Sequence, residues 1–182
     1  MGTLSNKRDE WVAEFGNSRV LDLGSGCDKQ PGAHGVDIEP RCGADYVLDL
    51  EKTPWPFPND QFGVVYALQV LEHLPDRVSV MKEIYRVCYH GALVAVSVPD
   101  GFCPGYAQDP THKSPWNIGT FLYFCPKQYP GNWDKVPYSM GVNFRVLDFH
   151  THNTSEGKPW GGNFNNDDLR VYLQVIKSER GE

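Results

Sequence analysis

The stretch Arg19–Gly26, RVLDLGSG, decides the fold together with the short stretch Gly35–Ile38, GVDI, that follows it. The first reads as a buried strand that runs directly into a glycine-rich turn, and the second as a strand that brings Asp37 to its end. Glycines after a strand let the backbone approach a ligand closely, and an acid at the end of the next strand can accept from both ribose hydroxyls. The pattern therefore predicts an adenosine-bearing ligand at the carboxyl ends of these strands.

The spacing between the two strands discriminates among adenosine ligands. A dinucleotide site needs the pattern G-x-G-x-x-G and a following helix, whereas this chain has G-S-G-C-D-K. The connection from Cys27 to Gly35 is short and contains Pro31 and Gly32, which excludes an ordinary crossover helix. Because no helix N-terminus can then hold a pyrophosphate, a nucleotide-cofactor oxidoreductase is the weaker alternative.

Strand-like and helix-like segments alternate over the first two thirds of the chain, which is typical of an α/β sheet with crossovers. Beyond the two strands above, we expect strands at 46–50, 62–67 and 92–98 and helices at 7–15 and 76–88. Residues 144–150 and 168–177 alternate like an antiparallel strand pair. The prediction is one domain, residues 1–182, with a Rossmann-like, mostly parallel sheet, three α/β/α layers and a shortened first crossover.

Residues 99–141 differ from the rest because they are dense in proline, glycine and aromatic residues, with one helix expected around 115–124. A long irregular segment inside a compact domain is usually functional, so we expect it on the substrate side. Asp109 and His112 are weak candidates for a catalytic pair, although Asp-Pro-Thr-His is also an ordinary turn sequence. The aromatic residues could wall an apolar acceptor pocket or form the core of this region.

Composition narrows the function further. The net charge is −6 and no run of lysine and arginine exists, so there is no strong nucleic-acid signal. No apolar run approaches the length of a membrane span. The five cysteines contain no C-x-x-C pair, which favours a reduced, cytoplasmic protein. His150 and His152 alternate on a strand without an evident third ligand, so we expect no metal.

Three stretches together resemble the class I S-adenosylmethionine-dependent methyltransferases. They are VLDLGSGCDKQPGAHGVDIEP, DLEKTPWPFPNDQFGVVYALQVLEHLPD and MKEIYRVCYHGALVAVSVPD. The chain is most similar to the small type-11-like branch, in which the first helix is reduced to a loop. The resemblance covers roughly residues 19–100, and the later DPTHKSPWNIGTFLYF also resembles a segment often found there.

The resemblance implies methyl transfer from S-adenosylmethionine to an unidentified acceptor. The acidic charge and the aromatic segment favour a small molecule. The alternative is a module that binds the cofactor without catalysis. The oligomeric state cannot be read from the sequence.

The resemblance also implies the cofactor-binding residues, which lie on the turns that follow the strands. Asp22, Gly24 and Gly26 would line the methionine end, Asp37 would accept from the ribose, and Asp49 from the adenine amino group. In the family's third-glycine position stands Asp28, and Lys29 is either a substitute cation or a solvated loop lysine. Asp22 could also anchor the loop, Asp49 cap a turn, and His73 cap a helix. The full set is Asp22, Gly24, Ser25, Gly26, Asp37, Ile38, Asp49, Leu50, Leu68, Gln69 and His73.

Overall fold

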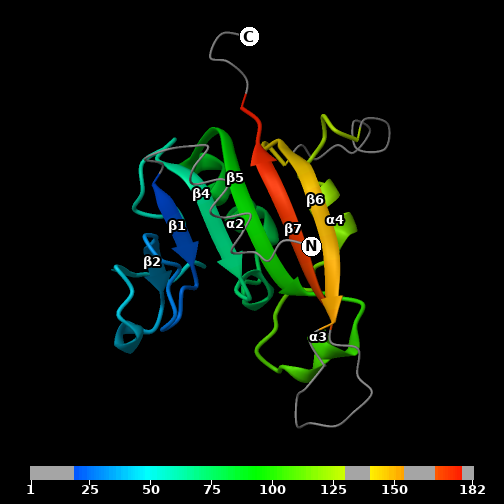
Figure 1. Cartoon of the computed structure of the whole chain (residues 1–182), viewed down its shortest axis with the longest axis horizontal. Coiled ribbons are helices and arrows are strands. Elements are labelled where there is room, and N and C mark those ends of the chain that lie inside the picture. Colours follow the sequence, from blue (N-terminus) through cyan, green and yellow to red (C-terminus); the bar gives the residue numbers. More distant parts are fainter. Residues whose placement is uncertain (1–18, 130–139, 154–166, 178–182) are drawn as a thin grey trace.

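The structure is a computed structural model that describes residues 19–129, 140–153 and 167–177. Among the described residues, seven strands form one sheet in the order β3-β2-β1-β4-β5-β7-β6 (Figure 1). The strands are β1 (Val20–Leu23), β2 (His34–Asp37), β3 (Tyr46–Val47), β4 (Phe62–Leu68), β5 (Cys88–Pro99), β6 (Phe144–Asn153) and β7 (Asp167–Val175). The division of the chain into one domain spanning 1–182 stays a prediction.

The sheet is mostly parallel. β1 pairs in parallel with β2 and β4, β2 with β3, and β4 with β5, whereas β7 is antiparallel to both β5 and β6. β7 therefore runs against the other described strands. Every residue of β1 is buried, and so are the first six of β4. Both strands are mostly apolar, with Asp22 the exception in β1, because a parallel sheet is covered on both faces. The predicted Rossmann-like α/β sheet with a C-terminal antiparallel pair is confirmed.

Two helices cover one face of this sheet. α2 (Arg77–Val87) begins at the N-cap Asp76, whose carboxylate accepts from the Val78 and Ser79 amides. α4 (Ile118–Leu122) begins at Asn117 with a reciprocal capping box. Their buried side chains, including Met81, Ile84 and Phe121, join one core cluster with the sheet, to which Trp116 also belongs. A smaller cluster around Val64 and Tyr66 is separate from this core. The helix expected at 7–15 lies outside the described residues. Any helical layer that it would form on the sheet lies outside them as well.

Several element boundaries differ from the sequence prediction. β3 ends at Val47 rather than at residue 50, because the chain then enters a turn in which the Lys52 amide donates to the Asp49 carbonyl. β5 begins at Cys88, directly after α2. Gly91 therefore lies inside β5 with a φ of 86° rather than past a helix end. The segment 99–141 holds a second short helix, α3 (Pro104–Gln108), that the sequence did not predict. Within the described ranges, no helix is long and apolar enough to cross a membrane.

The long connection between β3 and β4 is tied to α2 by hydrogen bonds to an ion pair that lies within that helix. Arg86 lies 2.7 Å from Glu83, and the side chains are 26% and 10% exposed. The Arg86 guanidinium also donates to the carbonyls of Trp55 and Phe57, and the Trp55 amide donates to Glu83 at 2.7 Å. Because no helix fills this connection in the structure, these bonds do the work of holding it against the sheet.

We predict that Arg86→Ala lowers the free energy of unfolding by about 3 kcal/mol, because it leaves the largely buried Glu83 carboxylate without its cation. Urea unfolding followed by circular dichroism measures the change. Arg41→Ala is the matched control: Arg41 pairs with Glu39 but its side chain is 87% exposed. We expect no measurable change there, because solvent screens an exposed pair. Equal losses in the two variants would contradict the assignment.

Candidate functional site

A cavity of about 300 Å³ opens at the carboxyl ends of the central strands. Gly24, Asp37 and Gln69 line it, and each directly follows or ends one of the strands β1, β2 and β4. β2 pairs with one side of β1, and β4 pairs with its other side. The strand order therefore reverses between β1 and β4, next to the cavity. Ligands of open α/β sheets bind at such a point. The arrowheads of β1, β4 and β5 point to this edge, near α3 (Figure 1).

Asp37 joins the first two turns of the site. One carboxylate oxygen accepts from the Gly26 amide at 2.8 Å, and the other accepts from the Glu39 amide at 2.8 Å. A carboxylate oxygen has two acceptor positions, so each keeps one that can accept from a ligand. The group is therefore oriented by the backbone and still has acceptor capacity at the cavity.

The rest of the cavity wall is apolar near Asp37. The side chain of Ile38 is 67% exposed, an unusual position for a large aliphatic residue beside an open cavity. Leu48, Leu50, Val70 and Leu74 complete the apolar lining. A flat ring against Ile38 would cover apolar surface that is now in water.

Two backbone positions beside the cavity have left-handed φ. Gly24 has a φ of 62°, and a Cβ there would lie 2.5 Å from Val70 Cγ2, so glycine is required for both reasons. Gln69 has a φ of 56° although it is not glycine. Its amide donates to the Ser97 carbonyl at 2.7 Å and its side chain donates to Ser97 Oγ at 3.1 Å. Such a conformation persists only where surrounding bonds hold it, and it is frequent at binding sites.

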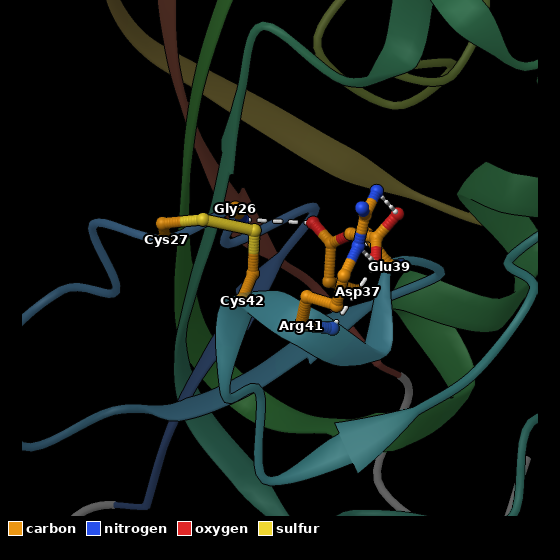
Figure 2. Close-up of a disulfide and its surroundings, with 6 residues drawn as sticks. All are labelled: Gly26, Cys27, Asp37, Glu39, Arg41 and Cys42. Atoms are coloured by element: carbon orange, nitrogen blue, oxygen red, sulfur yellow. Dashed lines mark hydrogen bonds and ion pairs between the residues drawn. A yellow bond between two sulfur atoms is a disulfide. The ribbon is translucent and has the colours of Figure 1, made fainter.

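A disulfide links the turns that follow β1 and β2. Cys27 is bonded to Cys42, next to the hydrogen bond from Gly26 to Asp37 (Figure 2). Cys42 lies in the 3-10 turn η1 (Pro40–Cys42). The expectation that all cysteines are reduced is wrong for this pair, because the fold brings together two residues that are 15 positions apart. The cytoplasmic location stays a prediction.

We predict that alkylation of the denatured, unreduced protein modifies Cys88, Cys103 and Cys125 only, the three cysteines outside the disulfide. Intact mass spectrometry counts the labelled thiols, and prior reduction should add the remaining pair. Cys42→Ser should lower the free energy of unfolding by about 3 kcal/mol, the loop-closure value for a loop of this size. Labelling of every cysteine without reduction would contradict the bond.

The segment after α3 is anchored to the turn that follows β4. That turn is a 3-10 helix, η2 (Leu71–His73). Ser114 Oγ donates to the Leu71 and Leu74 carbonyls, and Trp116 Nε1 donates to the Leu71 carbonyl. The amides of Lys113 and Ser114 donate to the Glu72 carbonyl at 2.7 and 3.0 Å. The two segments are about forty residues apart in sequence, and these bonds bring them together beside the cavity.

These bonds place Asp109 and His112 near His73, which lines the cavity. Asp109 and His112 do not line it themselves. The rings of His73 and His112 have centroids 5.0 Å apart, and His112 Nε2 lies 3.8 Å from an Asp109 carboxylate oxygen. His112 also stacks on Tyr106. Their catalytic role stays a prediction.

Glu72 is the residue of this region that sequence reasoning missed. Its side chain is 1% exposed, and neither carboxylate oxygen has a hydrogen-bond partner among the other described residues. The pKa of Glu72 is raised to about 7. Burial is the largest cause, and the charges of Asp168 and Asp109 also raise it, whereas a hydrogen bond from its own backbone amide lowers it. The only sequence signal was its position beside His73 in LEHLP, which also suits a helix cap.

Most of the predicted cofactor residues lie at the cavity: Gly24, Asp37, Ile38, Asp49, Leu50, Gln69 and His73 line it. Asp22, Ser25, Gly26 and Leu68 do not line it. Asp22 is buried, accepts from the Gln30 amide at 2.8 Å, and has its pKa raised by burial, so it anchors the loop. Lys29 pairs with Asp45 at 2.7 Å, so a loop contact replaces the cofactor contact considered for it. The lining residues not predicted are Leu48, Glu51, Val70, Leu74 and Lys113.

Comparison with known proteins agrees with this geometry. Residues 21–96 match a family model described as a methyltransferase domain. Over these residues the chain is similar to class I, S-adenosylmethionine-dependent methyltransferases. The predicted resemblance is confirmed, and S-adenosylmethionine is the expected cofactor of this domain.

Curated relatives and solved structures extend the comparison. Cycloartenol-C-24-methyltransferase of Arabidopsis thaliana is 31% identical over 117 residues, which are 61% of this chain and 34% of that protein. The chain thus spans about a third of the length of the curated relatives it matches. A SAM-dependent methyltransferase structure from Methanosarcina mazei has a TM-score of 0.66 at 14% identity, covering 94% of this chain and 98% of that one. One from Archaeoglobus fulgidus has a TM-score of 0.60 at 17% identity, covering 94% and 92%.

The cavity residues fit this cofactor chemically. Its lining offers the carboxylates of Asp37 and Asp49 together with aliphatic side chains. The cation in the lining, Lys113, is paired with Glu51. Carboxylates suit hydroxyl and amino donors, whereas a pyrophosphate needs cations or a helix N-terminus. The cavity therefore has a lining that fits a nucleoside without phosphates.

Proposed function

We propose that this chain transfers a methyl group from S-adenosylmethionine to a small-molecule acceptor. The observation that supports it most directly is the position of Asp37, whose carboxylate is oriented by the Gly26 and Glu39 amides at the edge of the cavity. An acid in this position accepts from both ribose hydroxyls.

The remaining cofactor contacts follow from the same cavity. Ile38 packs against the adenine ring, and Asp49 with the Leu50 amide binds its polar edge. Asp22, Gly24, Ser25 and Gly26 lie toward the methionine end, the last two through the backbone. Leu68, Gln69 and His73, on and after β4, complete this end. These assignments combine the family resemblance with the cavity lining.

When bound, the cofactor supplies a methyl group already activated by the sulfonium. The protein's part is then to exclude water and to align the acceptor with that group, which can supply most of the acceleration. Asp109 and His112 lie on the side of the cavity where His73 is found, so they are the groups positioned to accept a proton from an acceptor hydroxyl.

Two observations favour a small and largely apolar acceptor. The Arabidopsis relative is named as a methyltransferase of cycloartenol. In this chain Phe102, between β5 and α3, is 85% exposed, which places an aromatic ring in water beside the segment that contains Asp109 and His112. The acidic net charge of −6 also disfavours a nucleic-acid acceptor.

We predict that Asp37→Asn weakens the binding of S-adenosylhomocysteine by about 10- to 100-fold, the cost of losing charged hydrogen bonds of about 1.5–3 kcal/mol. Isothermal titration calorimetry measures the affinity, and thermal unfolding of the ligand-free protein shows whether the loop stays folded. Asp148→Asn is the matched control, because Asp148 is exposed on β6 at the far edge of the sheet.

Stabilisation by NAD and not by S-adenosylhomocysteine would overturn the cofactor assignment. Methyl transfer is tested separately, by release of S-adenosylhomocysteine in the presence of a panel of sterol-like, phenolic and carboxylate acceptors. Tight cofactor binding with no turnover of any acceptor class would favour the alternative, a cofactor-binding module without catalysis.

A further inference from the structure

The turn after β4 and the segment after α3 bring three metal-ligating side chains together. Glu72, His73 and His112 each have a ligating atom within 4.8 Å of the other two. Tetrahedral ligands of a transition metal lie about 3.4 Å apart, as bond lengths near 2.1 Å require. Small side-chain rotations would therefore close the three atoms around one ion.

Glu72 is the independent indication that something binds here. Its carboxylate is almost completely buried, yet neither oxygen has a hydrogen-bond partner among the other described residues. Buried carboxylates are normally hydrogen-bonded, paired with a cation or bound to a metal. Lys113, whose backbone amide donates to the Glu72 carbonyl, pairs its side chain with Glu51 instead. The charges of Asp109 and Asp168 add to the negative field around Glu72.

The two histidines are held in the tautomer that a metal needs. His112 Nδ1 lies 2.7 Å from the Tyr106 carbonyl, which can only accept, so Nδ1 carries the proton and Nε2 keeps its lone pair. His73 Nδ1 lies 3.1 Å from Thr111 Oγ1, and that hydroxyl donates to an Asp109 carboxylate oxygen at 2.6 Å. Thr111 therefore accepts from His73 Nδ1–H, which leaves Nε2 of His73 as the available ligand atom. Metal-binding histidines typically donate their second ring nitrogen to a carbonyl or carboxylate in this way.

We propose that Glu72, His73 and His112 bind a divalent transition-metal ion at the edge of the cofactor cavity. Two imidazoles and one carboxylate form a donor set suited to Zn²⁺, Fe²⁺ or related ions rather than Mg²⁺ or Ca²⁺. Three protein ligands leave at least one coordination position open, and His73 borders the cavity. The site replaces the sequence-based expectation of no metal, which considered only His150 and His152. It does not depend on methyl transfer, although with the ion bound to His112 Nε2 only Asp109 remains to accept a proton from an acceptor.

The test uses the whole chain stripped with EDTA and titrated with Zn²⁺ by calorimetry, with no cofactor present. We expect one equivalent to bind the wild type and to raise its melting temperature. Glu72→Gln and His112→Gln should weaken Zn²⁺ binding by more than the roughly 10- to 100-fold that the loss of an outer-shell partner costs. Thr111→Val removes only the hydroxyl that orients His73, so its loss should fall within that 10- to 100-fold range. Co²⁺ in place of Zn²⁺ gives a visible absorption spectrum whose intensity should change in Glu72→Gln.

His150→Gln is the matched control, because His150 is an exposed histidine on β6 and would report adventitious binding of Zn²⁺ to surface imidazoles. We expect its affinity to equal that of the wild type. Thermal unfolding without metal shows that each variant is folded, and the exposed Thr111→Val variant keeps the test decisive if a buried substitution fails. Absence of a stoichiometric Zn²⁺ site, or equal binding by wild type, Glu72→Gln, His112→Gln and Thr111→Val, would overturn the proposal. Because S-adenosylhomocysteine binding is measured separately, that result would leave the proposed cofactor function standing.

Discussion

The parallel pairing of β1 with both β2 and β4 is the constraint on which the rest of the structure depends. Leu21, Asp22 and Leu23 each have a partner on both sides, so the three strands end at the same edge. The turns that follow β1, β2 and β4 then each form part of the cavity wall. Because β1 is buried along its length, moving its register by one residue would turn buried side chains to the opposite face and would also displace Gly24 from its place beside Val70.

The turns at this edge are held together by polar contacts rather than by helices. The Gly26 amide and the Asp37 carboxylate join the first two turns, and the Cys27–Cys42 disulfide links the same turns covalently. Farther along, Arg86 and Glu83 hold the connection between β3 and β4. Because ordinary crossover helices are missing at these places, less apolar surface is available for packing there. Hydrogen bonds, the ion pair and the disulfide therefore position the site.

The segment from Asp109 to Trp116 gives the site its second half. Ser114 and Trp116 donate to the carbonyls of η2, and the Asp109–His112 stretch then lies against Glu72 and His73. The same contacts leave the Glu72 carboxylate buried, with no hydrogen-bond partner for either oxygen among the other described residues. His73 belongs to both the cofactor cavity and the proposed metal-ligand cluster, so we expect a change in either one to affect the other.

Local patterns in the sequence were enough to determine the strands around the cofactor cavity, because the apolar runs, the glycines after β1 and the acid ending β2 each carry their meaning within a few residues. Asp37 could therefore be predicted from the local pattern, whereas Ile38 and Gln69 were implied by the family resemblance. The disulfide, the Glu72–His73–His112 cluster and the Lys29–Asp45 ion pair could not, because each depends on residues that meet only after the sheet has formed. Glu72 shows the reason most clearly: in LEHLP it is an ordinary acid, and only the packing of Ser114 and Trp116 over η2 decides that its charge is buried.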